Sequence, residues 1–438
     1  MAKVIPFKAM HYNTDVVGGL KAVVTPPYDI ISSAQQQAFY DEHPFNVIRL
    51  EYGKEEAGDT SENNKYTRAG TALDEWLESG VLKFEDRNTF YIYGQNFVLE
   101  DGIKRTCKGI IGLVRIEEFE KNIVLPHEET LSKAKTDRFN LMQATDCNFS
   151  CIYALYMDQE SLVTPMVKEL SRGQADINFT CDDGIEQSLW MVQDEETCKK
   201  ITQGFADKQL FIADGHHRYE TALNYRNKMR EENPDYTGKE LYNYMMMFLM
   251  DIADDGLAVF PTHRMLRDLP GFDEVQVLDA LSDNFTIEKV TAQDDVAKDI
   301  ARNLEIRGQN DKIFAMYTGK EYYYTLTLKS MDAQTQALPG KSKSYCALDV
   351  SILHTLILDR VFGIDSDNMK NQTNLVYTRD PKEAENSVKN GDFQCSFFLN
   401  PTKISEISEV SLVGEKMPQK STYFYPKLVT GIVMNKFQ

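Results

Sequence analysis

A short apolar segment that runs directly into a glycine turn and a helix constrains this sequence more than any other feature. Residues 210–213 are apolar, and Asp214-Gly215-His216-His217-Arg218 follows without a break. Apolar residues at helical spacing come next, at 222–229, so we expect strand, turn and helix in succession. Because the first N–H groups of a helix lack partners within it, such a turn attracts anions. The pattern predicts a phosphate site, with Gly215 permitting close approach and Arg218 supplying a charged fork.

Asp214 stands at the end of the predicted strand, where a carboxylate can hold a divalent cation or accept a proton. His216 and His217 add two imidazoles to the same turn. From the residues alone, the alternative is a surface turn that the histidine pair caps.

Two further segments gather polar and charged side chains with little apolar periodicity. Residues 125–130 contain His127 and Glu128, and the cations and carboxylate that follow are Lys133, Lys135, Asp137 and Arg138. Residues 417–427 contain Lys420, Ser421 and Thr422 before an aromatic run. The first segment suits a general base with phosphate-neutralising cations, and also a solvated loop and helix start. In the second, Lys420 and the two hydroxyls suit a phosphoryl group, while Tyr423, Phe424 and Tyr425 are more typical of a strand core than of a stacking platform.

The charge balance limits the function classes. With 48 Lys+Arg against 67 Asp+Glu the formal charge is −19, which argues against a protein that grips nucleic-acid backbones. The start of the chain has no long apolar run, and the most apolar stretch, 242–260, is interrupted by Asp251, Asp254 and Asp255. We therefore expect a cytoplasmic protein with a small-molecule substrate and no membrane segment. The oligomeric state stays open, with a homodimer as the alternative to a monomer.

The order of apolar patterns predicts an α+β fold in two lobes, 1–268 and 269–438, divided near Leu269-Pro270-Gly271. We expect a helix over 66–77 and paired strands over 89–99 and 108–116 around an Asp101-Gly102 turn. We also expect a strand over 46–50 and a hairpin formed by 245–252 and 257–260. An apolar helix over 348–362 carries His354, which we expect to be a core histidine.

Four motifs, in order along the whole chain, resemble the bacterial and archaeal family called domain of unknown function 1015. They are Pro26-Pro27-Tyr28-Asp29, Leu125-Pro126-His127-Glu128, the run from Ala213 through Asp214-Gly215-His216-His217-Arg218 to Tyr219, and Met417-Pro418-Gln419-Lys420-Ser421-Thr422. The stretch from Asp214 to Arg218 is also similar to the phosphate-binding turn of the ParB/sulfiredoxin superfamily, which includes free-serine kinases. That local resemblance implies a ParB/sulfiredoxin-like core and a nucleotide or pyrophosphate bound at Gly215 to Arg218.

The resemblance to free-serine kinases also implies a carboxylate that acts as a base on the serine hydroxyl and a magnesium ion on the phosphates. Glu128 is the first candidate for that base, and Asp29 is the reserve. His217 is an alternative proton acceptor, and Asp214 is the expected magnesium ligand. The remaining expected phosphate- or substrate-binding residues are His127, Lys135, Asp137, Arg138, Gly215, His216, Arg218, Tyr219, Lys420, Ser421 and Thr422.

The leading hypothesis is a phosphotransferase that acts on a small hydroxyl metabolite, with free L-serine and O-phosphoserine as the expected pair. The phosphate donor is ATP, ADP or pyrophosphate, and the cofactor is Mg²⁺. Two alternatives remain: a ParB-like nucleotide-binding switch or DNA-associated module, and a metal-dependent phosphohydrolase.

Overall fold

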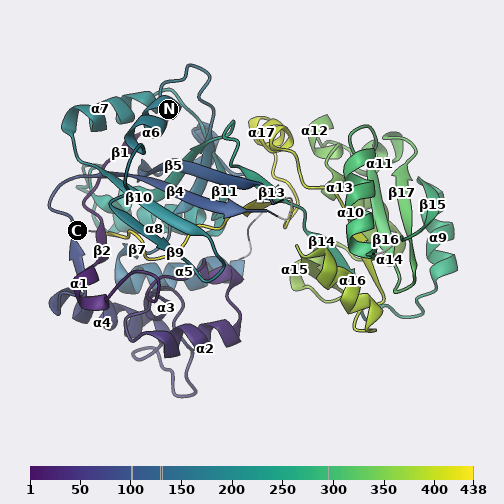
Figure 1. Cartoon of the computed structure of the whole chain (residues 1–438), viewed down its shortest axis with the longest axis horizontal. Coiled ribbons are helices and arrows are strands. Elements are labelled where there is room, and N and C mark those ends of the chain that lie inside the picture. The colour runs from purple at the N-terminus through teal and green to yellow at the C-terminus, as the bar shows by residue number, and fades with distance from the viewer. Residues whose placement is uncertain (100–101, 129, 131, 294, 438) are drawn as a thin grey trace. The chain divides into compact units, whose positions relative to one another are not determined.

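The computed structural model describes residues 1–99, 102–128, 130, 132–293 and 295–437, the side chains of 132–134 excepted (Figure 1). The chain forms two units. Unit 1 comprises Met1–Pro126, Thr130–Leu257 and Pro426–Gln438, and unit 2 comprises His127–Glu129 and Ala258–Tyr425. The sequence-based boundary lies after residue 268, whereas the structural units change after Leu257 and the chain end returns to unit 1.

A mixed sheet forms the centre of unit 1. Its strand order is β6-β11-β8-β12-β5-β4-β10-β9, and β1 pairs with β5. The central strand β12 (Tyr244–Asp251) lies between β8 and β5 and is almost entirely buried, as a continuous apolar run requires. The other strands are β1 (Val4–Ile5), β4 (Phe90–Val98), β5 (Lys104–Arg115), β6 (Val124–Leu125), β8 (Ile152–Tyr156), β9 (Ile177–Thr180), β10 (Glu186–Val192) and β11 (Leu210–Asp214).

Helices and two small strand pairs complete unit 1. Polar side chains fix several helix starts: Ser32 and Asn64 form capping boxes at α2 and α4, and Asp194 caps α7. The α-helices are α1 (Thr14–Val17), α2 (Ser33–Glu42), α3 (Ile48–Glu51), α4 (Lys65–Glu78), α5 (Ser132–Thr145), α6 (Thr164–Leu170), α7 (Glu195–Gly204) and α8 (His216–Glu232). The short helical turns are η1 (Tyr28–Ile30), η2 (Phe119–Lys121) and η3 (Leu241–Asn243).

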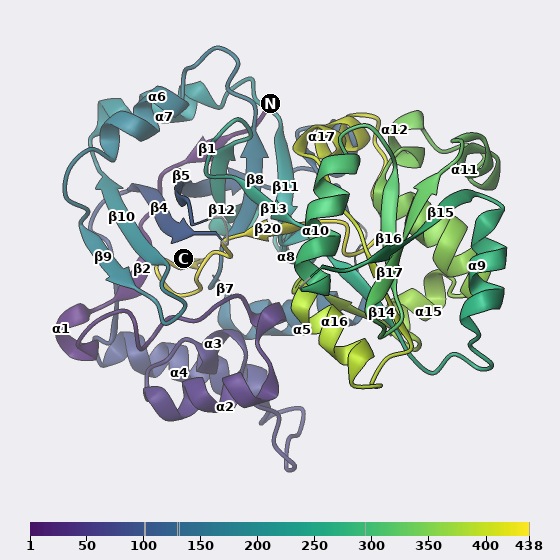
Figure 2. The same cartoon turned by 45° about the vertical axis from the view of Figure 1, so that its right-hand side comes forward.

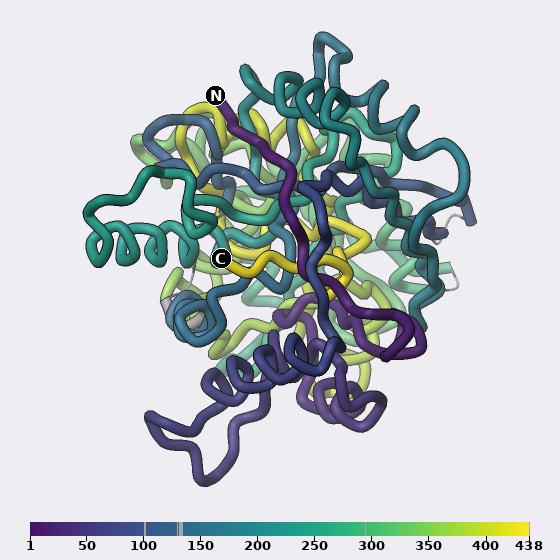
Figure 3. Tube along the Cα trace, turned by 90° about the vertical axis from the view of Figure 1, so that its left-hand side faces the viewer, coloured from purple at the N-terminus to yellow at the C-terminus, as the bar shows by residue number. Residues whose placement is uncertain are grey.

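The two ends of the chain meet in unit 1. Met10 of β2 (Met10–Tyr12) pairs with Met434, and Figure 3 shows the yellow C-terminal segment beside the purple N-terminal one. Strand β2 also pairs with β3 (Leu82–Phe84), and β21 (Asn435–Lys436) pairs with β7 (Cys147–Asn148). None of the helices in the described residues combines the length and the apolar character needed to cross a membrane.

Unit 2 is built on an antiparallel sheet of order β15-β17-β16-β19-β14-β18. Helices α10 (Val296–Arg307) and α16 (Pro381–Lys389) pack side by side on it, and their apolar residues share one core with β16 (Figure 2). The strands are β13 (Ala258–Phe260), β14 (His263–Leu266), β15 (Phe285–Thr291), β16 (Ile313–Tyr317), β17 (Tyr322–Leu328), β18 (Leu375–Thr378), β19 (Cys395–Phe398) and β20 (Tyr423–Tyr425).

The helices of unit 2 include one unusual segment. Between α13 (Asp349–Ile352) and α14 (Arg360–Phe362) the chain forms a π-helix, η4 (Leu353–Asp359). The remaining helices are α9 (Glu274–Ser282), α10 (Val296–Arg307), α11 (Asp332–Ala337), α12 (Lys343–Cys346), α15 (Ser366–Asn371), α16 (Pro381–Lys389) and α17 (Ile404–Leu412).

The predicted α+β class is confirmed, and two local predictions are wrong. Residues 46–50 were expected to form a strand, but Ile48–Glu51 is helix α3, because Asn46 binds the Ile48 N–H through its side chain and starts a turn. The segments 245–252 and 257–260 do not form a hairpin, since β12 pairs with β5 and β8 while β13 pairs with β20. Strands β4 and β5 do pair as expected. Asp101 of the expected turn lies outside the described residues.

Candidate functional site

The strand–turn–helix that the sequence predicts is present in unit 1. Strand β11 ends at Asp214, Gly215 is the N-cap with φ 96°, and α8 begins at His216. Only glycine adopts this φ without strain. A Cβ at position 215 would also lie 2.9 Å from Nε of Arg218, so glycine lets the guanidinium fold back against the turn.

Two cations hold the Asp214 carboxylate. Its Oδ2 accepts from Nη2 of Arg218 at 2.7 Å, and its Oδ1 accepts from Nζ of Lys427. Burial opposes ionisation of this carboxyl, but Lys427 and Arg218 together lower the pKa of Asp214 well below its ordinary value. The carboxylate is therefore ionised at neutral pH and is a poor proton acceptor there.

Arg218 leads from the turn into a line of buried polar groups. Its Nη1 donates to the Ser150 hydroxyl at 3.1 Å, and that hydroxyl donates to Oε1 of Glu51 at 3.0 Å. Arg138 follows, with Nη1 lying 3.4 Å from the same Glu51 oxygen. These four residues are at most 8% exposed. They line a cavity of about 30 Å³, which has room for a water molecule.

Arg138 joins this line to the N-terminal motif. Its guanidinium lies over the Tyr28 ring, 4.0 Å from the centroid, and its Nε donates to Asp137 at 2.9 Å. Asp137 also pairs with Lys65, with an N–O distance of 2.8 Å. Although burial opposes it, Arg138 and Lys65 lower the pKa of Asp137 to about 2. Residues 26–29, 137–138 and 214–218 thus converge in one unit.

Asp29 differs from the other carboxylates of this cluster. It is exposed, and it makes no hydrogen bond or ion pair with any residue that the structure describes. Asp29 lies close enough to Arg218 for the two charges to interact. Burial lowers the pKa of Arg218, and the carboxylates of Asp214 and Asp29 more than offset that effect and raise it. Asp29 is therefore an accessible carboxylate near the cationic side of the turn.

The other sequence-predicted residues of unit 1 have different surroundings. Lys135 pairs with Glu220 at 2.8 Å. His216 is buried and contributes to lowering the pKa of Asp214, and His217 is half-buried in the first turn of α8. Tyr219 lies in the core, and its hydroxyl both donates to and accepts from the Glu117 backbone. We therefore leave Tyr219 out of the proposed site.

The remaining predicted residues lie together in unit 2. Buried His127 bonds through Nε2 to Oγ1 of Thr422 at 2.9 Å, and its carbonyl accepts from Met417 N–H at 2.6 Å. The Ser421 hydroxyl donates to the backbone carbonyl of Pro418. Two segments that are far apart in sequence thus form one local structure.

Glu128 and Lys420 meet in this structure through the backbone. Oε1 of Glu128 accepts from the Lys420 N–H at 2.7 Å, and Lys420 has φ 57°. Left-handed backbone is unfavourable for lysine, so the Glu128 carboxylate stabilises a strained turn. Buried Arg264 also donates to the Lys420 carbonyl, at 3.2 Å.

The residues present do not fit a magnesium ion held by the protein at Asp214. Both carboxylate oxygens already accept from cations, so a divalent ion there would have to displace Lys427 or Arg218. In the part of the chain that is described, no group of three or more His, Cys, Asp or Glu side chains is arranged to hold a metal.

Sequence reasoning missed four members of the unit 1 cluster: Lys65, which pairs with Asp137, and the residues Lys427, Glu51 and Ser150. Lys427 closes the segment 417–427 that was singled out, but the role of phosphate-binding lysine was given to Lys420. Glu51 and Ser150 carry no local signal, because they reach the cluster only through the packing of α3 and of the segment before β8.

We expect Gly215→Ala to displace Arg218 as well as strain the backbone, lowering the free energy of unfolding by about 1–3 kcal/mol for the strain alone. The matched control is Gly238→Ala, where φ is 78° but a Cβ would meet no atom within 4 Å. Urea unfolding followed by tryptophan fluorescence reports on unit 1, which contains both tryptophans, Trp76 and Trp190. If both variants lower the free energy of unfolding equally, the clash between a Cβ at position 215 and Arg218 does not contribute to the loss.

The lowered pKa of Asp137 predicts a loss of stability in acid. A carboxyl whose pKa is about 2 when folded and 3.8 ordinarily stabilises the fold above pH 3.8. That contribution, about 2 kcal/mol, is lost as the pH falls towards 2. Asp137→Asn should therefore be less stable at pH 7 and should show a flatter decline between pH 4 and 2, measured by urea unfolding at each pH. The same slope in both proteins would contradict the assignment.

The comparison with known sequences identifies the family. The profile of the family described as "Protein of unknown function (DUF1015)" matches residues 4–351. This chain belongs to the DUF1015 family, as predicted; three of its four motifs lie within the matched residues, and Met417-Pro418-Gln419-Lys420-Ser421-Thr422 lies outside them. Among curated proteins, no sequence matches it.

Solved structures show a distant likeness. A free serine kinase in complex with AMP is 12% identical, with a TM-score of 0.35 over 74% of this chain and 90% of that one. A truncated SbnI from Staphylococcus aureus is 11% identical, with a TM-score of 0.35 over 73% and 85%. A conserved hypothetical protein from Pyrococcus furiosus is 13% identical, with a TM-score of 0.33 over 71% and 90%. Scores this low do not identify a common fold, so the function must be argued from the side chains of this chain.

Proposed function

We propose that the protein is a phosphotransferase that acts on a small hydroxyl metabolite, with free L-serine as the acceptor and O-phosphoserine as the product. The observation that carries the proposal is the unit 1 turn. A glycine-capped helix N-terminus, with Arg218 and Lys427 on Asp214, lies within electrostatic reach of the exposed Asp29 carboxylate. Helix N–H groups and cations bind phosphates, and a nearby accessible carboxylate can take a hydroxyl proton.

In this proposal the donor is ATP, ADP or pyrophosphate, with its phosphates at Gly215, His216 and Arg218. The acceptor oxygen forms a bond to the terminal phosphorus as the bond to the leaving phosphate oxygen breaks, and the hydroxyl proton passes to Asp29. Arg218 and Lys427 neutralise charge on the transferring group. The choice of serine rests on the similarity of residues 214–218 to the turn of free-serine kinases.

The proposal assigns the base to Asp29 rather than Glu128. Asp214 is held by two cations and Glu51 is buried against Arg138, whereas Asp29 is exposed. Glu128 belongs to unit 2, where it stabilises the Lys420 turn. No step is assigned to a protein-held magnesium ion, and the ParB/sulfiredoxin-like core stays a prediction.

Phosphorus NMR of the purified protein tests the proposal. ATP, ADP and pyrophosphate are supplied in separate samples, each with and without L-serine and with and without MgCl₂. We expect a phosphomonoester signal that requires both serine and one donor. Inorganic phosphate released without serine would identify a hydrolase instead, and no turnover of any donor would contradict the phosphotransferase assignment.

A further inference from the structure

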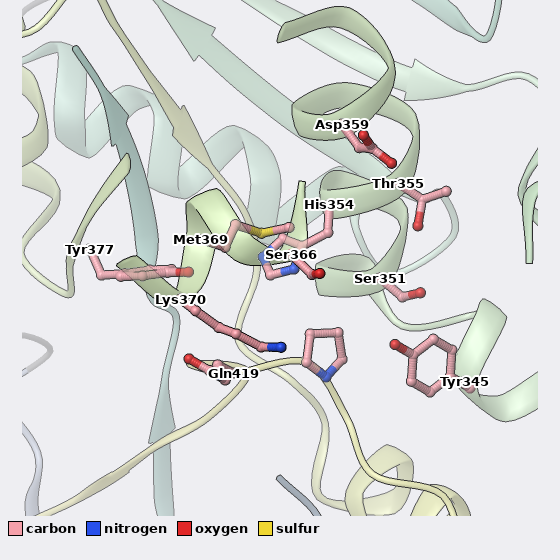
Figure 4. Close-up of a pocket in the computed structure, with 11 residues that line it drawn as sticks. Tyr345, Ser351, His354, Thr355, Asp359, Ser366, Met369, Lys370, Tyr377 and Gln419 are labelled. Carbon is pink, nitrogen blue, oxygen red and sulfur yellow. The ribbon is translucent and has the colours of Figure 1, made fainter. Parts of the chain in front are cut away.

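Unit 2 contains a pocket that the proposed function does not use. Its volume is about 210 Å³, and Figure 4 shows polar side chains that point into it from several elements. The π-helix η4 supplies His354, Thr355 and Asp359, α15 supplies Lys370, and β18 supplies Tyr377. Single π-helical turns inside α-helices recur at functional sites, because they reposition side chains at a local cost. The volume suits a small metabolite rather than a large cofactor.

The hydrogen bond from Arg264 fixes the proton position on His354. Nη2 of Arg264 lies 3.1 Å from Nε2 of His354, and a guanidinium can only donate, so Nε2 accepts. Burial and the Arg264 charge lower the pKa of His354 well below its ordinary value, so the ring is neutral. The single proton is therefore on Nδ1. That nitrogen makes no hydrogen bond to any described residue, which leaves a donor on a side chain that lines the pocket.

Arg264 itself places a positive charge behind the pocket. It is 1% exposed, its donors contact the Thr262 carbonyl, the Lys420 carbonyl and His354, and its Nε has no partner. It forms no ion pair within 4 Å with any carboxylate in the described residues. Burial lowers the pKa of Arg264 to about 10, although Tyr377 and the Glu128 carboxylate act to raise it. A buried cation that is only partly compensated is costly, so an anion bound beside His354 would stabilise this arrangement.

Two more groups that line the pocket can donate hydrogen bonds. The Tyr377 hydroxyl is buried and has no hydrogen-bond partner, and Figure 4 shows it directed towards Met369 within the pocket. The Lys370 ammonium is exposed, and its nearest carboxylate, Asp367, is 3.8 Å away. One acid lines the pocket, Asp359, and it is exposed.

We propose that this pocket binds a small oxyanion, the phosphate or carboxylate group of a metabolite, through Nδ1–H of His354, the Tyr377 hydroxyl and the Lys370 ammonium. Buried donors without partners discriminate strongly in favour of an acceptor that satisfies them. The site is separate from the phosphate-binding turn proposed in unit 1, so either assignment can fail without the other.

Isothermal titration calorimetry of the full chain tests the site, with inorganic phosphate and succinate as separate probes at millimolar concentration. Tyr377→Phe and Lys370→Gln should each weaken binding of the preferred probe about tenfold or more, since each removes a hydrogen bond to a charged ligand. Tyr377→Phe should not destabilise unit 2, because the hydroxyl that it removes has no partner. Its loss of affinity therefore cannot come from unfolding.

Two matched variants and one variant of unit 1 serve as controls. Tyr317→Phe and Lys329→Gln make the same chemical changes in unit 2 at side chains that do not line the pocket, and both should bind like the unmodified protein. Gly215→Ala alters the phosphate-binding turn proposed in unit 1, so it should not remove the part of the binding that Tyr377→Phe and Lys370→Gln weaken. Binding that is lost in Gly215→Ala but kept in Lys370→Gln would assign the anion to unit 1 and overturn the proposal. The absence of heat with both probes would overturn it as well.

Discussion

Asp29→Asn is expected to lower the rate of phosphoryl transfer by a factor of about 10²–10⁴, the usual contribution of a general base. The amide keeps the size of the side chain but cannot take the hydroxyl proton. Because Asp29 is exposed and unpaired among the described residues, the substitution should leave the unfolding midpoint almost unchanged. The measurement is the initial rate of phosphomonoester formation, with the donor and the acceptor both saturating.

Two comparisons make this result specific. Asp207→Asn removes an exposed carboxylate of the same unit and should keep the full rate. Asp29→Glu keeps a carboxylate and should retain part of the activity lost in Asp29→Asn. If Asp29→Asn is fully active while Glu128→Gln is inactive, the base is Glu128, the first candidate from the sequence, and the assignment to Asp29 is wrong.

The local pattern around residues 210–229 was sufficient to predict β11, the turn and α8, because strand, glycine and helix periodicity lie within one short window. The polar residues of the turn could also be recognised from the sequence. The sequence could not reveal that Lys427 neutralises Asp214, since the two residues are 213 positions apart. Such a pairing depends on the return of the chain end to unit 1.

The two wrong predictions about the fold also arise from contacts that a local sequence pattern does not show. A hairpin was expected around Asp254-Asp255-Gly256, since two apolar segments flank this acidic turn. Strand partners depend on the whole sheet, and β5 and β8 provide longer ladders for β12 than β13 would. The strand expected over 46–50 failed because the Asn46 side chain supplied a local alternative to strand pairing.

Burial of the charge cluster changes what alanine substitutions should do. From sequence alone, replacing Asp214 or Arg218 by alanine would be expected to remove activity and spare the fold. In the structure both residues belong to a buried network, so each substitution leaves a partner uncompensated. The free energy of unfolding of each variant therefore has to be measured beside its activity, so that lost catalysis can be told from lost folding.

Arg138→Ala is expected to lower the free energy of unfolding of unit 1 by about 3–5 kcal/mol, because it leaves buried Glu51 without its ion-pair partner and Asp137 with Lys65 alone. Arg138 is 6% exposed, contacts Glu51 and Asp137, and packs on the Tyr28 ring. Urea unfolding followed by the fluorescence of the two tryptophans measures the change. Arg172→Ala, which breaks an exposed pair with Glu169, should cost about 1 kcal/mol or less.

A double substitution separates the lost charge from the lost packing. Arg138→Met restores much of the side-chain volume, and combining it with Glu51→Gln removes the carboxylate that has lost its ion-pair partner, since Asp137 still pairs with Lys65. If unpaired charge dominates, the double variant should be more stable than Arg138→Met alone, since an amide at position 51 can still accept from Ser150. A double variant that is less stable by the sum of the single effects would show that Glu51 and Arg138 are not coupled. In that case the line from Asp214 to Asp137 would be a series of independent contacts rather than one electrostatic network.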